Sequence, residues 1–323
     1  MLIHGINNNI KYCFSNRMGA SIGINDPDPI SIIRGLSRFS RKVASVLSRD
    51  FQAFTPGVQY GNESDLYFDD PLLLDAINKE RKAPETVIPI IHQTSGNQPL
   101  KGGFIEKMAQ ISNLCQIFQT RNVCVHLPLE PFDTTAELLE VLTQDGLLDA
   151  IADVNIAIDL EQNWHDSWFG FTEHLLEFFP ALDDALERKG HEGLQDKFGM
   201  TFDSGHFFAQ YHLSGASWRD MEKDMENLFS RLGDRIRTIH LHGNDGTGDH
   251  HALFRRNHPN TLQGRRFKKN QDILFKHLPM LNLSDRNTRD KWDTVIISEI
   301  GNPFNEDAFI EHARLIAANL HEK

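Results

Sequence analysis

Six short runs of apolar, largely β-branched residues recur between residues 86 and 299, with helix-like segments between them. Runs that are apolar nearly throughout are typical of strands buried on both faces of a parallel sheet. Parallel strands joined by helices are connected by right-handed crossovers, which leaves few possible architectures. The six runs are residues 86–92, 122–126, 154–161, 199–203, 236–242 and 294–299.

The segments between the runs have the spacing of amphipathic helices. Ser217, with Asp220 three residues later, has the pattern of a helix start before "WRDMEKDMENLFSRLG" (218–233). Thr134 or Thr135 has the pattern of another helix start, before the segment that runs to residue 151. Further helices are expected over residues 29–49, 71–83, 104–119, 134–151, 171–189 and 305–322.

Two more strands, near residues 10–14 and 51–55, would bring the number to eight. Eight strand–helix units in 323 residues favour an α/β fold of the (β/α)₈ TIM-barrel class, as a single domain over residues 1–323. Residues 86–300 carry the legible strands, whereas residues 1–85 are poorly matched. An open doubly wound sheet is the alternative, but no GxGxxG loop follows a first strand.

The cysteine content and the lengths of the apolar runs indicate the cellular compartment of the chain. Its three cysteines, Cys13, Cys115 and Cys124, form no CxxC pair, which argues against a disulfide framework or a thiolate zinc site. No apolar run has the length of a signal peptide or a membrane span. We therefore expect a cytoplasmic protein with no membrane partner, and we leave a homo-oligomer open.

The net charge of −12 disfavours nucleic acid as a partner, because such binding depends on lysine and arginine neutralising phosphates. One stretch, "FRRNHPNTLQGRRFKKN" (254–270), is nevertheless rich in basic residues. We interpret it as a solvated loop or helix face, with a phosphate contact as the alternative. Nucleic acid is disfavoured by the charge without being excluded.

Each of the six runs ends in or near a residue that can bind a metal ion. These residues are His92, His126, Glu161, Asp203, His240 and Glu299. The 16 histidines and 45 acidic residues fill roughly one position in five, so six such endings in succession would be a rare coincidence. Strand ends converge on one face of a barrel, where active sites lie. Carboxylate and imidazole ligands suit Zn²⁺, Mn²⁺, Co²⁺ or Fe²⁺.

Two local motifs extend this set. In "FDSGHF", Asp203 and His206 are three residues apart across a turn that contains glycine. In "GTGDHHALF", Asp249 and His251 are two residues apart in a glycine-rich loop, with His250 as a substitute for His251. His242 is expected to point the other way along its strand and either to support a metal ligand or to be structural.

The motifs "VHLP", "DLEQN", "FDSGHF", "IHLHGNDGTGDHH" and "IISEI" resemble those of the xylose-isomerase-like TIM-barrel superfamily. That superfamily contains sugar isomerases and epimerases as well as the endonuclease IV family, and the resemblance covers about residues 86–300. The isomerase and epimerase branch implies one divalent ion, Zn²⁺ or Mn²⁺, with His206 beside the substrate. The implied ligands are Glu161, Asp203, His240 and Glu299.

We therefore predict a metal-dependent isomerase or epimerase that acts on a sugar or sugar-like substrate. Proton transfer would pass through an enediolate that the metal stabilises, with Glu161 and Glu299 as the acid–base pair and His206 hydrogen-bonded to the substrate. The alternative is a hydrolase like endonuclease IV with two or three zinc ions. That branch implies additional ligands, namely His92, His126, His206, Asp249 and His251. "HQTSGN" lacks the tyrosine expected in an abasic-site endonuclease, which favours the isomerase.

Overall fold

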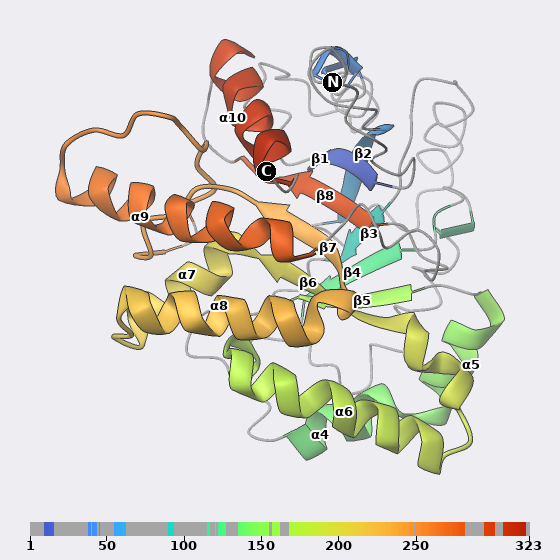
Figure 1. Cartoon of the computed structure of the whole chain (residues 1–323). Helices are drawn as coiled ribbons and strands as arrows, with labels where there is room; N and C mark the ends of the chain where they lie inside the picture. The colour runs from blue at the N-terminus through green and yellow to red at the C-terminus, as the bar shows by residue number, and fades with distance from the viewer. Residues whose placement is uncertain are drawn as a thin grey trace.

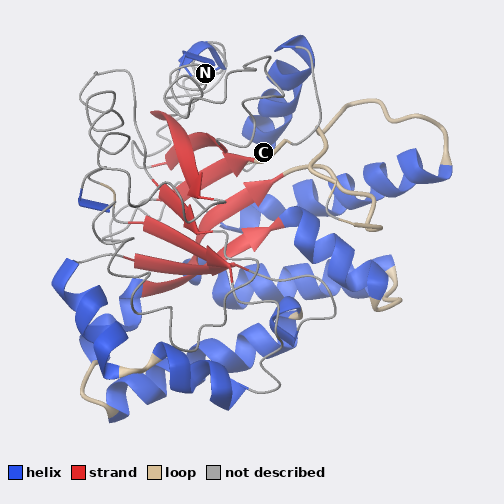
Figure 2. Ribbon diagram, turned by 180° about the vertical axis from the view of Figure 1, so that it is seen from behind, coloured by secondary structure: helices blue, strands red, loops and turns tan. Residues whose placement is uncertain are grey.

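The computed structural model describes residues 10–15, 38–39, 41–43, 45, 55–62, 90–93, 115–116, 120, 122–126, 135–154, 157–161, 168–248, 250–281, 294–300 and 306–320. Within them, eight parallel strands close into a barrel in chain order, because β1 pairs with both β2 and β8 (Figures 1 and 2). The strands are β1 (Ile10–Ser15), β2 (Thr55–Asn62), β3 (Ile90–Gln93), β4 (Asn122–His126), β5 (Ala157–Glu161), β6 (Phe198–Asp203), β7 (Ile236–Leu241) and β8 (Thr294–Ser298). The closed parallel sheet agrees with the expected barrel.

Two strands extend beyond their expected ends. The second strand was expected near residues 51–55, whereas β2 covers Thr55–Asn62. The third was expected over residues 86–92, and β3 covers Ile90–Gln93, one residue past His92. Residues 51–54 and 86–89 lie outside the described residues. The sequence of β2, "TPGVQYGN", contains one proline and two glycines, which are rare in strands. Pairing with β1, rather than local propensity, accounts for this strand.

Helices surround the second half of the barrel, and α6, α8 and α9 lie side by side on its outer face (Figure 1). The α-helices with printed bounds are α4 (Thr135–Leu142), α5 (Asp145–Val154), α6 (Thr172–Arg188), α7 (Ser204–Leu213), α8 (Trp218–Leu232), α9 (Leu262–His277) and α10 (Glu306–Asn319). Short 3₁₀ helices are η4 (Trp168–Gly170), η5 (Glu192–Lys197), η6 (Gly233–Arg235) and η7 (Leu278–Leu281). Among the described helices, none combines the length and hydrophobicity needed to cross a membrane.

One helix expectation needs correction. Residues 134–151 form two helices, α4 and α5, separated at Thr143, whose hydroxyl donates to the carbonyl oxygen of Leu139 at 2.8 Å. The basic stretch is partly helical, since α9 begins at Leu262, in keeping with its interpretation as a loop or helix face. Ser217 caps α8 as expected, in a capping box with Asp220. The helix expected at 71–83, and most of those at 29–49 and 104–119, lie outside the described residues.

Side chains of the strands alternate between two environments, as the two-residue period of a strand requires. On β5 and β6, Ile158, Leu160 and Phe202 belong to the large apolar cluster that includes residues of the surrounding helices. The intervening positions carry buried polar side chains. These are Asp159, Glu161, Thr201 and Asp203. The barrel interior is therefore polar along these strands, and its uppermost polar residues lie at the carboxyl ends.

A buried ion pair lies in the barrel two residues below the strand end of β5. Arg237 Nε donates to Asp159 Oδ1 at 2.7 Å, and Thr238 Oγ1 donates to Asp159 Oδ2 at 2.7 Å. The guanidinium also donates to three backbone carbonyls. Gly199 leaves room for it, because a Cβ there would lie 2.3 Å from Arg237 Nε. Every charge in this pair is thus hydrogen-bonded.

Candidate metal centre

Four adjacent strands deliver acidic and imidazole side chains to one place. Glu161 is the last residue of β5, Asp203 the last of β6, and His240 lies one residue before the end of β7. Glu299 directly follows β8, one residue later than its expected place inside the strand. Asp203 and His240 are paired in the register of β6 and β7. All four side chains are at most 4% exposed.

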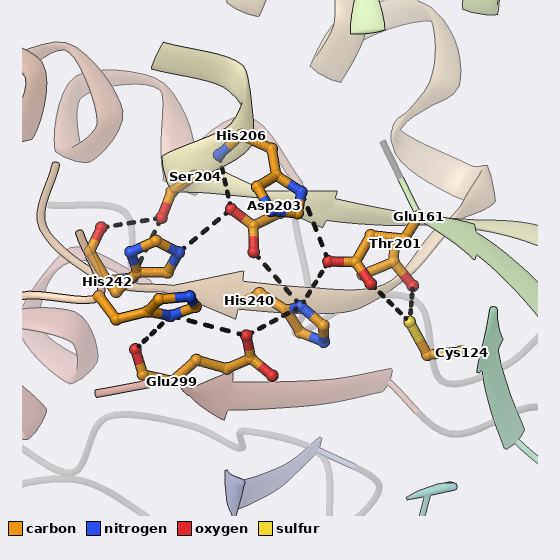
Figure 3. A network of polar contacts seen from close by, with 10 residues as sticks. Cys124, Glu161, Thr201, Asp203, Ser204, His206, His240, His242 and Glu299 are labelled. Carbon is orange, nitrogen blue, oxygen red and sulfur yellow. Dashed lines mark hydrogen bonds and ion pairs between the residues drawn. The ribbon is translucent and has the colours of Figure 1, made fainter. Parts of the chain in front are cut away.

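Three carboxylates meet at one nitrogen of His240 (Figure 3). Nδ1 of this imidazole lies 3.1 Å from Glu161 Oε1, 3.4 Å from Asp203 Oδ2 and 3.7 Å from Glu299 Oε2. A single imidazole carries at most one positive charge, so it cannot balance the three carboxylates around its Nδ1. Burying like charges this closely is costly unless a cation compensates them.

The donor set fits a divalent metal ion. Glu161, Asp203 and His206 each offer a ligand atom within 4.8 Å of the others, as do Asp203, His240 and Glu299. Oδ2 of Asp203 is buried and accepts no well-directed hydrogen bond from the described residues. Carboxylate oxygens and imidazole nitrogens are the ligands that Zn²⁺ and Mn²⁺ take in proteins.

The charges in the cluster shift one another's protonation. Burial lowers the pKa of His240, but Glu299 and Glu161 outweigh it and raise that pKa well above its ordinary value. Burial likewise raises the pKa of Asp203, but the imidazoles of His206 and His242 outweigh it and hold that pKa well below its usual range. The cluster therefore favours the ionised form of Asp203.

His206 reaches the cluster from the first turn of a helix. Asp203 is the N-cap of α7 and its Oδ1 accepts from the backbone N–H of His206 at 2.8 Å, the usual interaction of an N-cap. The expected glycine-containing turn is thus helical from Ser204 onward. His206 Nδ1 lies 3.6 Å from Glu161 Oε1. The cap aligns Asp203 and His206 toward the same point.

His242 also joins the cluster, contrary to the expectation that it points away. Its Nε2 lies 3.2 Å from Asp203 Oδ1, and its ring stacks on His251 with centroids 4.3 Å apart. His251 has a positive φ of 42° and places its Nδ1 3.0 Å from the carbonyl oxygen of Glu299. His242 lies two residues after His240, so the two-residue period of a strand places both side chains on the same side of the sheet. The two rings form one wall of the centre.

The remaining predicted ligands are placed only in part. The backbone of His92 lies in β3, and His126 is the last residue of β4, paired in register with Glu161. Their side chains and the whole of Asp249 lie outside the described residues. His250 does not replace His251, because its Nε2 pairs with Asp245 Oδ1 at 2.9 Å in the loop.

Two residues that the sequence did not single out contact the centre. Cys124 Sγ lies 3.3 Å from Glu161 Oε2 and accepts a hydrogen bond from Thr201 Oγ1 at 3.2 Å. Burial, together with Glu161, raises the pKa of this thiol well above its ordinary value. Strand periodicity could have identified both, since each lies two residues before a predicted ligand, His126 or Asp203.

Substituting Gly205 by alanine is expected to disturb the wall of the centre. A Cβ at residue 205 would lie 2.0 Å from Cε1 of His242 and 2.6 Å from its Nε2, so the imidazole must move away from Asp203. We expect a loss of about 1–3 kcal/mol in the free energy of unfolding, measured in urea. G193A is the control, because a Cβ at Gly193 meets nothing within 4 Å. Equal stability of the two variants would contradict the prediction.

No protein-family model matches the sequence, and no curated protein does. Solved structures do resemble it. A D-tagatose 3-epimerase-like protein matches with a TM-score of 0.60 at 17% identity, over 96% of this chain and 97% of the other. An IolI protein with a bound zinc atom matches with a TM-score of 0.59 at 14% identity, over 96% and 98%. A xylose isomerase domain-containing protein from Salmonella typhimurium LT2 matches with a TM-score of 0.57 at 13% identity, over 99% and 100%.

The chain has the fold of the xylose-isomerase-like TIM barrels. The resemblance that its motifs suggested is confirmed at the level of fold. In this barrel, the acidic and imidazole cluster lies at the carboxyl ends of the strands, the face where TIM-barrel active sites are found.

Proposed function

We propose that this xylose-isomerase-like barrel is a divalent-metal-dependent isomerase or epimerase of a sugar or sugar-like substrate. The observation that carries the proposal is the convergence of three buried carboxylates on Nδ1 of His240. The likeness to an epimerase-like protein and to a zinc-bound IolI protein supports it. Glu161, Asp203, His240 and Glu299 would hold the ion, which we expect to be Zn²⁺ or Mn²⁺.

The proposed reaction moves a proton at a carbon next to a carbonyl. When bound, the ion would act as a Lewis acid on a substrate carbonyl and the adjacent hydroxyl. The C–H of the carbon that carries this hydroxyl would then be more acidic. Glu161 ends β5 and Glu299 directly follows β8, and both carboxylates face His240. In the barrel, β6 and β7 separate the two strands. One would accept the proton and the other return it. His206 would orient a substrate oxygen from α7.

A second candidate is an endonuclease IV-like hydrolase with two or three zinc ions. It is favoured by His251, whose Nδ1 lies 3.8 Å from Glu299 Oε2, the oxygen that also lies 3.7 Å from His240 Nδ1. His251 would add a ligand beside the first cluster, and a second ion there would help to stabilise attacking and leaving oxygens. The single tight cluster around His240 makes the isomerase our preferred function.

Metal content separates the two candidates. We expect elemental analysis of freshly purified protein to find one zinc or manganese ion per chain. Two or three zinc ions would support the hydrolase instead. Protein that remains metal-free after incubation with either ion would contradict both candidates.

Solvent exchange tests the reaction itself without knowledge of the product. Incubated in D₂O with a panel of keto- and aldo-sugars, the metal-loaded protein should incorporate deuterium next to the carbonyl of its substrate, seen as loss of that proton signal by NMR. A chelator should stop the exchange and added metal should restore it. Absence of exchange with every sugar, together with cleavage of abasic DNA, would favour the hydrolase over the isomerase.

A further inference from the structure

The thiol of Cys124 contacts the proposed metal ligand Glu161 inside the barrel (Figure 3). Cys124 is the third residue of β4, is fully buried, and packs with Val295 and Ile297 of β8. It also lies against His240. Cys124 therefore lies between apolar side chains of β8 and a carboxylate of the cluster.

The hydrogen bonds around the sulfur have a defined direction. Thr201 Oγ1 donates to Cys124 Sγ at 3.2 Å, and the thiol donates to Glu161 Oε2 at 3.3 Å. The other carboxylate oxygen, Oε1, lies 3.1 Å from His240 Nδ1 and 3.6 Å from His206 Nδ1. The two oxygens of Glu161 therefore have different partners, the thiol on one side and the imidazoles on the other.

We propose that Cys124 is a positioning residue that holds Oε2 of Glu161, so that Oε1 is the oxygen presented to the metal ion. This inference rests on the proposed metal-dependent function. A carboxylate that is free to rotate would offer either oxygen or both, which changes the coordination and the basicity of Glu161. Partners of this kind commonly affect metal affinity about 10- to 100-fold when they are removed. Thr201 serves the same arrangement by fixing the sulfur.

Cobalt substitution tests the proposal without a substrate, since the visible spectrum of Co²⁺ reports its coordination. We expect C124A to bind Co²⁺ about 10- to 100-fold more weakly than the wild type in a chelator competition, with shifted visible bands. C124S, which retains a donor, should lose less. C115A is the matched control, because Cys115 is also a buried thiol but lies in the helix-packed core; it should leave affinity and spectrum unchanged.

The outcomes are distinct. A sulfur-to-cobalt charge-transfer band in the wild type that disappears in C124A would mean that Cys124 binds the ion directly, which would overturn the positioning role. Equal affinity and spectra for C124A and C115A would overturn it as well. Wild-type protein that binds no Co²⁺ would contradict the metal centre, and this proposal with it.

Folding is checked by circular dichroism and by the urea midpoint of each variant. If C124A does not fold, T201V decides, because it removes the hydroxyl that fixes the sulfur and retains the shape of the side chain. We expect T201V to bind Co²⁺ more weakly than C115A, and C124S to bind it at least as tightly as T201V because it retains the donor. A T201V affinity equal to that of C115A would contradict the proposal.

Discussion

Replacing Glu161 by glutamine is expected to abolish tight metal binding and to lower turnover by about 10²- to 10⁴-fold, the usual contribution of a general acid or base. Glutamine retains the shape of the side chain but removes the charge that faces His240 Nδ1 at 3.1 Å. The wild type should unfold at a higher temperature when zinc is added, because the ion binds the folded state, and E161Q should show little of this increase.

The measurements are metal per chain by elemental analysis, the thermal midpoint with and without zinc, and solvent-deuterium exchange with the substrate that the sugar panel identifies. E187Q is the control, because Glu187 is an exposed glutamate on α6. Metal content and exchange rate that both stay at wild-type levels in E161Q would refute the role given to Glu161.

Replacing Arg237 by methionine is expected to lower the free energy of unfolding by about 3–5 kcal/mol, the usual cost of leaving one partner of a buried ion pair unpaired. The carboxylate of Asp159 is fully buried and receives its N–H donor from Arg237. The double variant D159L/R237M should recover most of this loss, since neither charge of the pair then remains to be compensated. K268M, which breaks an exposed pair with Asp272, should change stability by less than about 1 kcal/mol.

The loss in R237M should depend on pH. Burial raises the pKa of Asp159, and Arg237 opposes that rise. Without the guanidinium the folded-state pKa rises further, so the ionised form is penalised more at neutral pH. The difference from the wild type should shrink as pH falls through this raised pKa, because protonated Asp159 needs no counter-charge. Urea unfolding curves at several pH values measure it, and a constant difference would contradict the electrostatic explanation.

The strand ends of this protein were predictable because each apolar run ends in or near an acidic or imidazole side chain. Buried strands of a parallel sheet are apolar on their outer face, so Glu161, Asp203 and His240 stood out as polar residues at the ends of apolar runs. The barrel then brings together residues far apart in sequence, and the structure places these three side chains in contact. The role of each side chain stays a prediction.

Other features lacked a local signal. Helix α7 is buried along nearly its whole length, so its sequence "SGHFFAQYHL" has no polar face and no amphipathic pattern to recognise. Cys124 was considered only for disulfide and zinc-thiolate pairing, and the absence of a CxxC pair gave no reason to place it beside Glu161. The contact of His242 with Asp203, by contrast, had a signal in the sequence, because His242 lies two residues after His240 and strand alternation places both on the same side.

His312 on α10 connects two parts of the barrel mouth. Its Nδ1 accepts from the backbone N–H of Phe254, and its Nε2 lies 3.0 Å from Ser298 Oγ, next to Glu299. An imidazole that accepts at Nδ1 is uncharged, and burial lowers the pKa of His312 to about 3. In mildly acidic solution the unfolded chain would take up a proton here that the folded chain refuses. Acid therefore lowers the free energy of unfolding, through the buried contact between α10 and the end of β8, well before it protonates the folded imidazole.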